Sequence, residues 1–224
     1  MTQSILITAG GTSEPIDAVR VITNRSTGKT GVKLANFAHE KGWGVDLLLA
    51  RGLYPETKFP FPVHRFETVE ELGALMKERI RIGQPTGLVH SAAVSDYVFD
   101  HAETVGPNPN KIQSPGTGKI SGHLDSIRII LKPAPRLLAK IRSEWNFRGI
   151  LVSFKLETDQ EKLLIQSKRS LMDSGSDMVV GNTWGNHEES AMLVFGTDSK
   201  GETPAPLTIP RINLNSMILD FIQK

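Results

Sequence analysis

The chain has 224 residues, with 26 basic and 24 acidic side chains and a formal net charge of +2. A chain of this length buries about 70% of the surface that its unfolded form exposes, so one sizeable core is expected. The near balance of charge argues against a general electrostatic grip on nucleic acid or anionic lipid. Cysteine is absent, which excludes disulfides, cysteine zinc sites and a thiolate nucleophile.

The sequence contains neither a secretion signal nor a membrane-spanning run. Its first residues, MTQSILITAGG, include no basic region and only a four-residue apolar run, and 18 consecutive apolar residues occur nowhere. We therefore expect a soluble protein of the cytoplasm.

The first half of the chain alternates between predicted strands and helices. In order, these are a strand at 4–8, a helix at 30–41, a strand at 45–50, a helix at 67–82 and a strand at 88–93. This order is typical of an α/β fold with a doubly wound, mostly parallel, Rossmann-like sheet. Ligands of such sheets bind beyond the carboxyl ends of the strands, which here lie near residues 9, 50 and 92.

The second half begins with a stretch rich in proline, glycine and asparagine, residues 100–122, which we interpret as a mobile lid loop. The predicted elements after it are a strand at 127–131, a helix at 136–145, a strand at 150–154, a helix at 160–173, a strand at 178–181, a hairpin at 191–195 and 207–209, and a helix at 214–222. We see no repeat or linker, so residues 1–224 are predicted to form a single domain.

Two turns in the first 31 residues favour anion binding. Gly10, Gly11 and Thr12 directly follow the first strand, although glycine in a βα turn is common without any ligand. The second turn, from Asn24 to Gly31, contains Ser26, Thr27 and Gly28 and precedes a helix, whose first N–H groups can bind an anion. N-capping of the helix would need only one of these polar residues, whereas this run supplies several polar groups and two glycines. Neither turn has the spacing of a Walker loop or of a dinucleotide motif.

Charged residues near the other strand ends are further candidates. Asp96 follows the third strand, where a carboxylate can accept from a ribose hydroxyl or approach Mg²⁺; an ordinary Asx turn explains it equally well. Lys111 and Lys119 lie in the predicted lid, which would carry a lysine onto a phosphate as it closes. The six histidines lack zinc spacing, so no intrinsic metal is expected.

Four segments together resemble the phosphopantothenate-cysteine ligase family of coenzyme A biosynthesis. They are ILITAGGTSEPID with VITNRSTGKTG, then SAAVSDY, FKLETD and VVGN, and they occur in the family order over residues 5–182. The resemblance implies a two-step ligase: the carboxylate of 4'-phosphopantothenate attacks the α-phosphate of CTP or ATP, and the amine of cysteine then displaces the nucleotide. Mg²⁺ would accompany the nucleotide.

The resemblance also implies roles for individual residues. Asn24 matches the asparagine that contacts the acyl-nucleotide intermediate, and Lys119, favoured over Lys111, matches the lysine of the lid. The matches to nucleotide- and phosphate-binding positions are Gly10, Gly11, Thr12, Ser26, Thr27, Gly28, Ala92, Ala93, Asp96 and Phe154, with Lys168 and Asn182 as further candidates. Many bacterial relatives are fused to a flavin-dependent decarboxylase, whereas this chain begins at the ligase strand. We therefore expect a stand-alone ligase without FMN, and a homodimer, as is common in the family.

Two other functions remain as alternatives. One is an NAD(P)-dependent oxidoreductase, in which Arg51 would receive a 2'-phosphate, but the chain has no G-x-G-x-x-G turn. The other is a nucleotide-binding module without catalysis, which would keep both turns and release no pyrophosphate.

Overall fold

A computed structural model of the chain describes residues 3–105, 110–112, 118–124, 126–197 and 201–224. The main body is an eight-stranded sheet of order β13-β12-β11-β10-β6-β1-β4-β5, in which the six strands from β11 to β5 are parallel. The strands are β1 (Ser4–Ala9), β4 (Gly44–Ala50), β5 (Val63–Phe66), β6 (Gly87–His90), β10 (Ile150–Glu157), β11 (Met178–Thr183), β12 (Ser190–Phe195) and β13 (Leu207–Pro210).

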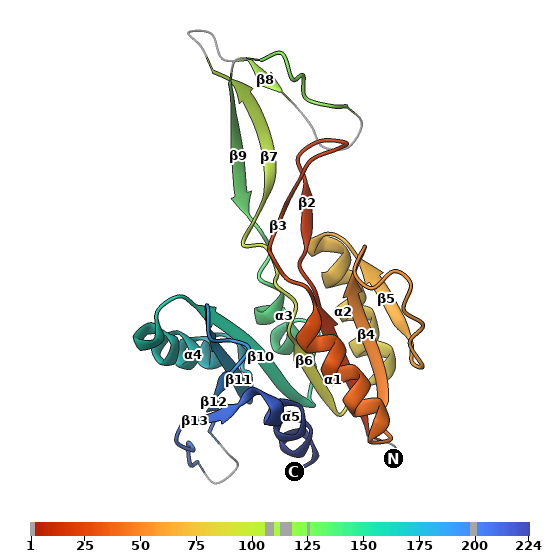
Figure 1. Cartoon of the computed structure of the whole chain (residues 1–224), viewed down its shortest axis with the longest axis vertical. Coiled ribbons are helices and arrows are strands. Elements are labelled where there is room, and N and C mark those ends of the chain that lie inside the picture. The colour runs from red at the N-terminus through yellow and green to blue at the C-terminus, as the bar shows by residue number, and fades with distance from the viewer. Residues whose placement is uncertain (1–2, 106–109, 113–117, 125, 198–200) are drawn as a thin grey trace.

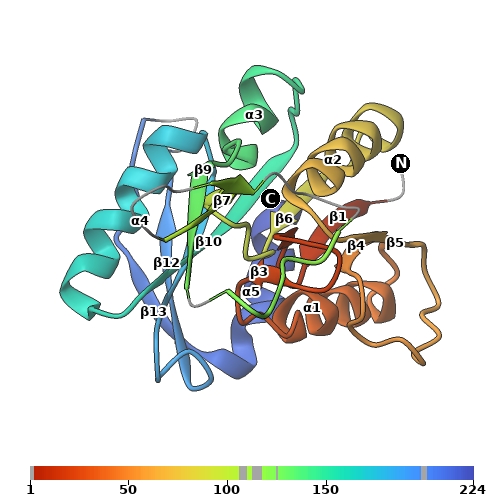
Figure 2. The same ribbon diagram turned by 90° about the horizontal axis from the view of Figure 1, so that it is seen from above.

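Helices cover both faces of this sheet (Figure 2), as the doubly wound interpretation predicted. One face carries α1 (Lys29–Glu40) and α5 (Leu214–Gln223), which follows the short helix η1 (Arg211–Asn213). The other carries α2 (Val69–Gly83), α3 (Leu137–Ser143) and α4 (Gln160–Ser174). Strand residues alternate between the two cores, Ile5 and Ile7 facing α1 while Leu6 faces α2.

Local sequence explains where the helices begin and end. The Thr68 hydroxyl accepts from the Glu71 N–H at 3.2 Å and caps α2, and the Asp159 carboxylate accepts from two N–H groups of the first turn of α4. Gly175 ends α4 at a φ of 64°. Helix boundaries therefore fall within one or two residues of most predictions.

A slender antiparallel arm projects from the sheet (Figure 1). It comprises β7 (Tyr97–Thr104), β8 (Lys111–Ile112) and β9 (Ile127–Pro133), and the hairpin β2 (Ser13–Pro15) and β3 (Val21–Thr23) runs beside it. Of the stretch predicted to be a mobile lid loop, 100–122, residues 100–104 and Lys111–Ile112 are strand, because β7 pairs with β8 and with β9, whereas 106–109 and 113–117 lie outside the described residues. The predicted strand at 127–131 belongs to this arm and not to the main sheet.

The tip of the β2–β3 hairpin is fastened to residues 118–124 of the arm. Ile16, Phe99, Ala102 and Ile120 form a small buried cluster there. The Asp17 carboxylate accepts from the N–H groups of Val19, Arg20 and Ile120 and pairs with the Arg20 guanidinium, which also donates to the Ile120 carbonyl. One carboxylate therefore joins the hairpin to the arm.

This anchor should depend on pH. Burial alone would raise the pKa of Asp17, but the hydrogen bonds from Val19, Ile120 and Arg20 outweigh it and lower the pKa to about 2, from an ordinary value of 3.8. The ionised form therefore contributes stability that is complete above about pH 4 and is lost as the pH falls through about 2. We expect the hydrogen-exchange protection of the Ile120 amide to fall across this window.

The matched variant is Asp17→Asn, which cannot ionise. Its Ile120 amide should be poorly protected at every pH, with no change between pH 4 and pH 2. Protection equal to that of the parent chain throughout would contradict the anchor.

Candidate functional site

The predicted turns meet at the carboxyl edge of the sheet, above β1 and β6. The carbonyl of Gly10 accepts from the N–H of Ala93 at 2.8 Å, and the Ala93 carbonyl accepts from the N–H of Thr12 at 3.2 Å. The Thr12 hydroxyl accepts from the N–H of Ser95 at 3.0 Å. The turn after β1 and the segment after β6 therefore form one continuous surface, which the sequence predicted only as two separate strand ends.

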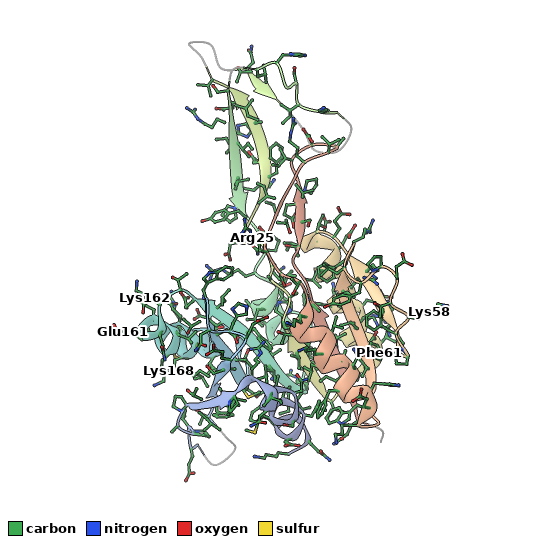
Figure 3. The ribbon with its side chains drawn as sticks, in the orientation of Figure 1. Arg25, Lys58, Phe61, Glu161, Lys162 and Lys168 are labelled. Carbon is green, nitrogen blue, oxygen red and sulfur yellow. The ribbon has the colours of Figure 1, made fainter. Side chains whose placement is uncertain are left out.

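Asn24 joins the second turn to this surface. Its side-chain Nδ2 donates to the carbonyls of Ala93 and Val94 at 3.2 and 3.3 Å. No described residue donates to its Oδ1, and the residue is exposed. Figure 3 labels the next residue, Arg25, where the β2–β3 hairpin returns to the main sheet. The carboxamide is thus oriented by protein groups on one side and open on the other.

Backbone geometry at the start of α1 requires glycine. Gly28 has a φ of 69° and is the N-cap of α1, without a side-chain cap. Ser26 and Thr27 precede it, and the Thr27 hydroxyl lies 3.4 Å from the N–H of Lys29. A Cβ at Gly28 would lie 3.2 Å from the nitrogen of Gly10, so the N-terminus of α1 adjoins the turn after β1. The first turn of α1 has no acidic residue, and a helix N-terminus of this kind suits an anion.

A buried polar layer supports the turns from below. The Thr8 hydroxyl accepts from the N–H of Ala92 at 3.1 Å and lies 2.8 Å from Nδ1 of His90. Burial lowers the pKa of His90 to about 4, so the ring is neutral at pH 7. The hydroxyl of Ser91 donates to the Thr8 carbonyl at 2.6 Å. Sequence reasoning missed Thr8, His90 and Ser91 as supporting residues; their position at strand ends was the available signal.

Phe154 and Asn182 occupy the adjoining part of the same edge. In the parallel ladder, Phe154 pairs with Val180, and Asn182 lies two residues further along β11. Phe154 is half-buried and packs on the core shared with α1, whereas Asn182 is buried. Asn182 is tied to α1 by Arg211, whose guanidinium donates to Asn182 Oδ1 at 2.5 Å and to Thr30 Oγ1 at 2.6 Å. Sequence analysis did not single out Arg211.

The charged candidates are dispersed. Asp96 is exposed at the base of the arm, where its carbonyl accepts from the N–H of Ala134 at 2.9 Å. Lys119 is exposed beside the Asp17–Arg20 turn, next to Gly118, whose carbonyl accepts from Ala18. Lys111 is in β8, and its side chain lies outside the described residues.

Lys168 and Lys119 both lie apart from the two turns. Lys168 is exposed on α4 (Figure 3). About four extended residues, roughly 13 Å, separate the turn beside Lys119 from Asn24. The structure thus gathers the glycine turns, Asn24, Ala92 and Ala93, and places Lys119, the residue predicted to be the lysine of the lid, outside that group.

A cavity of about 450 Å³ lies at the opposite edge of the sheet. Its walls include Ile5, Trp43, Asp46, Phe61 and Arg79. Phe61 lies on the flank of β4 and β5, away from Arg25 (Figure 3). This cavity is mostly apolar and its charged groups pair with each other, Arg79 donating to Asp46 at 2.6 Å. We place the site instead at the carboxyl edge, where N–H groups and side chains converge.

Two further properties bear on the function. Among the described residues, no three His, Asp or Glu side chains are grouped so that they could hold a metal ion. No helix within the described ranges is long and apolar enough to cross a bilayer.

Comparison with known proteins gives a consistent result. Residues 1–205 match the family model described as the C-terminal domain of DNA/pantothenate metabolism flavoproteins. The chain is 32% identical over 205 residues to the coenzyme A biosynthesis bifunctional protein CoaBC of Thermococcus kodakarensis, covering 89% of this chain and 46% of that protein. It is 23% identical to phosphopantothenate–cysteine ligase 2 of Oryza sativa, covering 97% of this chain and 78% of the rice protein.

A solved structure is similar over its whole length. The DNA/pantothenate metabolism flavoprotein of Streptococcus pneumoniae superimposes with a TM-score of 0.82 at 25% identity, covering 99% of both chains. The chain spans about half the length of the bifunctional relatives that it matches.

The contact between the two turns can be tested without any ligand. A Cβ at Gly11 would lie 2.8 Å from the carbonyl oxygen of Asn24, so Gly11→Ala must displace the backbone that carries Asn24. We expect a loss of about 1–3 kcal/mol in the free energy of unfolding, measured by urea denaturation.

Gly44→Ala in β4 is the matched control, because the nearest atom to its Cβ is 3.5 Å away. Its free energy of unfolding should stay within about 1 kcal/mol of the parent value. Equal losses in the two variants would show that the turns do not press on one another.

Proposed function

Because the chain belongs to the family of DNA/pantothenate metabolism flavoprotein C-terminal domains, we propose that it is a nucleotide-dependent ligase. It joins 4'-phosphopantothenate to L-cysteine in coenzyme A biosynthesis, with CTP or ATP as the nucleotide and Mg²⁺ carried by it. The name of the rice relative, a phosphopantothenate–cysteine ligase matched over 78% of its length, supports this assignment.

The proposed reaction has two steps. A carboxylate oxygen of phosphopantothenate attacks the α-phosphorus, which forms an acyl-nucleotide and releases pyrophosphate. The amine of cysteine then attacks the acyl carbon, loses a proton and expels the nucleoside monophosphate, which leaves the amide. Both steps need anions held at fixed positions, because orientation supplies much of the rate enhancement.

The observation that carries the proposal is the carboxamide of Asn24, held by Ala93 and Val94 beside the positive end of α1. In our assignment the N–H groups of the turns around Gly10 and Gly28 bind phosphate oxygens. Asn24 Oδ1 accepts from the acyl-nucleotide, and Phe154 lies beside the base. Hydrogen bonds made by a side chain that is already held in position are stronger where water is excluded.

We also propose that the protein is a homodimer whose arms form the interface. Six large apolar side chains are exposed on the arm and its neighbouring hairpin, namely Val19, Val21, Tyr97, Val105, Ile129 and Leu131. Ile129 and Leu131 are two residues apart in β9, so their side chains lie on the same face of the strand. An apolar set of this kind on a projecting strand pair is typical of an interaction surface.

Dimerisation would also explain the position of Lys119. It is separated from Asn24 of its own chain by roughly 13 Å of extended hairpin, and an arm that crosses to a second copy can bring it to that copy's Asn24. In this proposal the lid lysine acts between chains.

The decisive assay contains 4'-phosphopantothenate, cysteine, Mg²⁺ and either CTP or ATP, and follows pyrophosphate. We expect release that requires phosphopantothenate, and amide formation that also requires cysteine. Asn24→Ala should lower turnover by about 10²-fold, the size expected for loss of one preorganised polar group.

Gln223→Ala, which removes an exposed carboxamide at the end of α5, should behave like the parent chain. Absence of pyrophosphate with both nucleotides would refute the ligase and leave a nucleotide-binding module.

The dimer is tested by mass and by complementation. Light scattering should give twice the chain mass, and Leu131→Asp should give monomers, because a carboxylate would be buried at the interface. Asn24→Ala and Lys119→Ala proteins, each impaired alone, should recover activity when unfolded and refolded together, since a mixed dimer contains one intact site. A parent chain of monomer mass, or mixtures without recovery, would contradict action between chains.

A further inference from the structure

Arg211 stands at a junction of three elements of the candidate site. It opens η1, directly after β13, and its backbone N–H donates to the carbonyl of Glu189 at 2.8 Å. One guanidinium nitrogen donates to Asn182 at the end of β11, and the other to Thr30 in the first turn of α1. A single planar group therefore spans the edge of the sheet between the two elements that face the proposed nucleotide.

The charge of Arg211 has no direct carboxylate partner among the described residues. Both of its side-chain acceptors, an amide oxygen and a hydroxyl, are neutral. Burial lowers the pKa of Arg211, and the charge of Glu188 raises it in part. Glu188 itself pairs with Lys29 at 3.1 Å. The only carboxylate that acts on this half-buried cation is thus shared with Lys29, and the atoms that the guanidinium contacts directly are neutral, so its charge is incompletely balanced by the described residues.

The position of Arg211 in the fold indicates which kind of ligand would balance its charge. Thr30 is the second residue of α1, so the guanidinium lies beside the positive end of that helix. Positive features side by side disfavour each other unless anions lie beside them, and Glu188 is a single carboxylate set against the Lys29 ammonium, the Arg211 guanidinium and the helix end. A triphosphate bound at the start of α1 would satisfy both the guanidinium and the helix end.

We propose that Arg211 is a positioning residue of the nucleotide site, which orients the Asn182 carboxamide and the first turn of α1 and compensates the charge of the bound triphosphate. This inference rests on the proposed function. It adds a residue that acts through Asn182: because Arg211 occupies Asn182 Oδ1, the amide is turned so that its Nδ2, which has no described acceptor, is available to the ligand.

The test separates nucleotide affinity from chemistry. Binding of CTP and of ATP with Mg²⁺ is measured by calorimetry without phosphopantothenate, and kcat and KM are measured in the ligase assay. Arg211→Met should raise the nucleotide Kd and KM by about tenfold or more, as for loss of a charged hydrogen-bond donor, and should change kcat less.

Arg211→Lys should give an intermediate Kd, because an ammonium keeps the charge but cannot hold two acceptors in one plane. Arg81→Met, which alters an exposed arginine of α2 on the other face, is the matched control and should bind like the parent chain.

A double-mutant cycle with Asn182→Ala tests whether Arg211 acts through Asn182. If it does, the nucleotide Kd of the double variant should be at most about twofold higher than that of the more impaired single variant. If the fold-increase in Kd of the double variant equals the product of the two single fold-increases, the positioning role is overturned.

Further outcomes separate failure of the Arg211 proposal from failure of the ligase assignment. Should Arg211→Met fail to fold, Arg211→Lys decides, and a Kd equal to that of the parent overturns the proposal. A fall in kcat and melting temperature without any change in Kd would show a merely structural arginine. A parent chain that binds nucleotide but forms no amide would refute the ligase and leave the role of Arg211 in binding to be judged from Kd.

Discussion

The candidate site depends on one contact, the approach of the turn carrying Asn24 to the backbone after β6. Gly11 permits it, because a side chain there would meet the Asn24 carbonyl, and the Asn24 carboxamide maintains it through two hydrogen bonds. Thr8 and His90 hold the same backbone from below. Since hydrogen bonds to the backbone fix both the position and the direction of a side chain, the site is organised before any ligand arrives.

The sheet explains why such a contact can form here. Strand β6 lies between β1 and β10, so the chain leaves the centre in opposite directions on its two sides. The connections that follow β1 and β6 therefore run to opposite sides of the sheet, although the backbone directly after each strand is still paired at the carboxyl edge through Gly11 and Ala93. The first turn of α1 and the end of β11 lie at the same edge, and Arg211 connects them. Residues from both ends of the sequence thus contribute to a single edge.

Most of the main sheet was predictable, because apolar runs such as SILIT and VDLLLA have no alternative to burial. Of the arm, only β9 was predicted as a strand: β7 contains several polar residues and β8 has two residues, and the two strands are held by pairing with each other and, for β7, with β9. The glycine turns and Asn24 were predictable as local motifs. Arg211 was not, because its partners Thr30 and Asn182 are 181 and 29 residues away in sequence and no local pattern marks the contact.

The closure at the base of the arm has a consequence for how this fold can vary. The N–H of Ala134 meets the carbonyl of Asp96 at 2.9 Å, so the segment between them leaves and re-enters the domain at one point. Segments whose ends already touch can be lengthened, shortened or replaced without disturbing the framework that bears them. The arm is in this sense a module of its own: residues of β7 and β9 can change without altering the register of the main sheet, whereas Ile120 is tied to the β2–β3 hairpin and fixes that part of the arm.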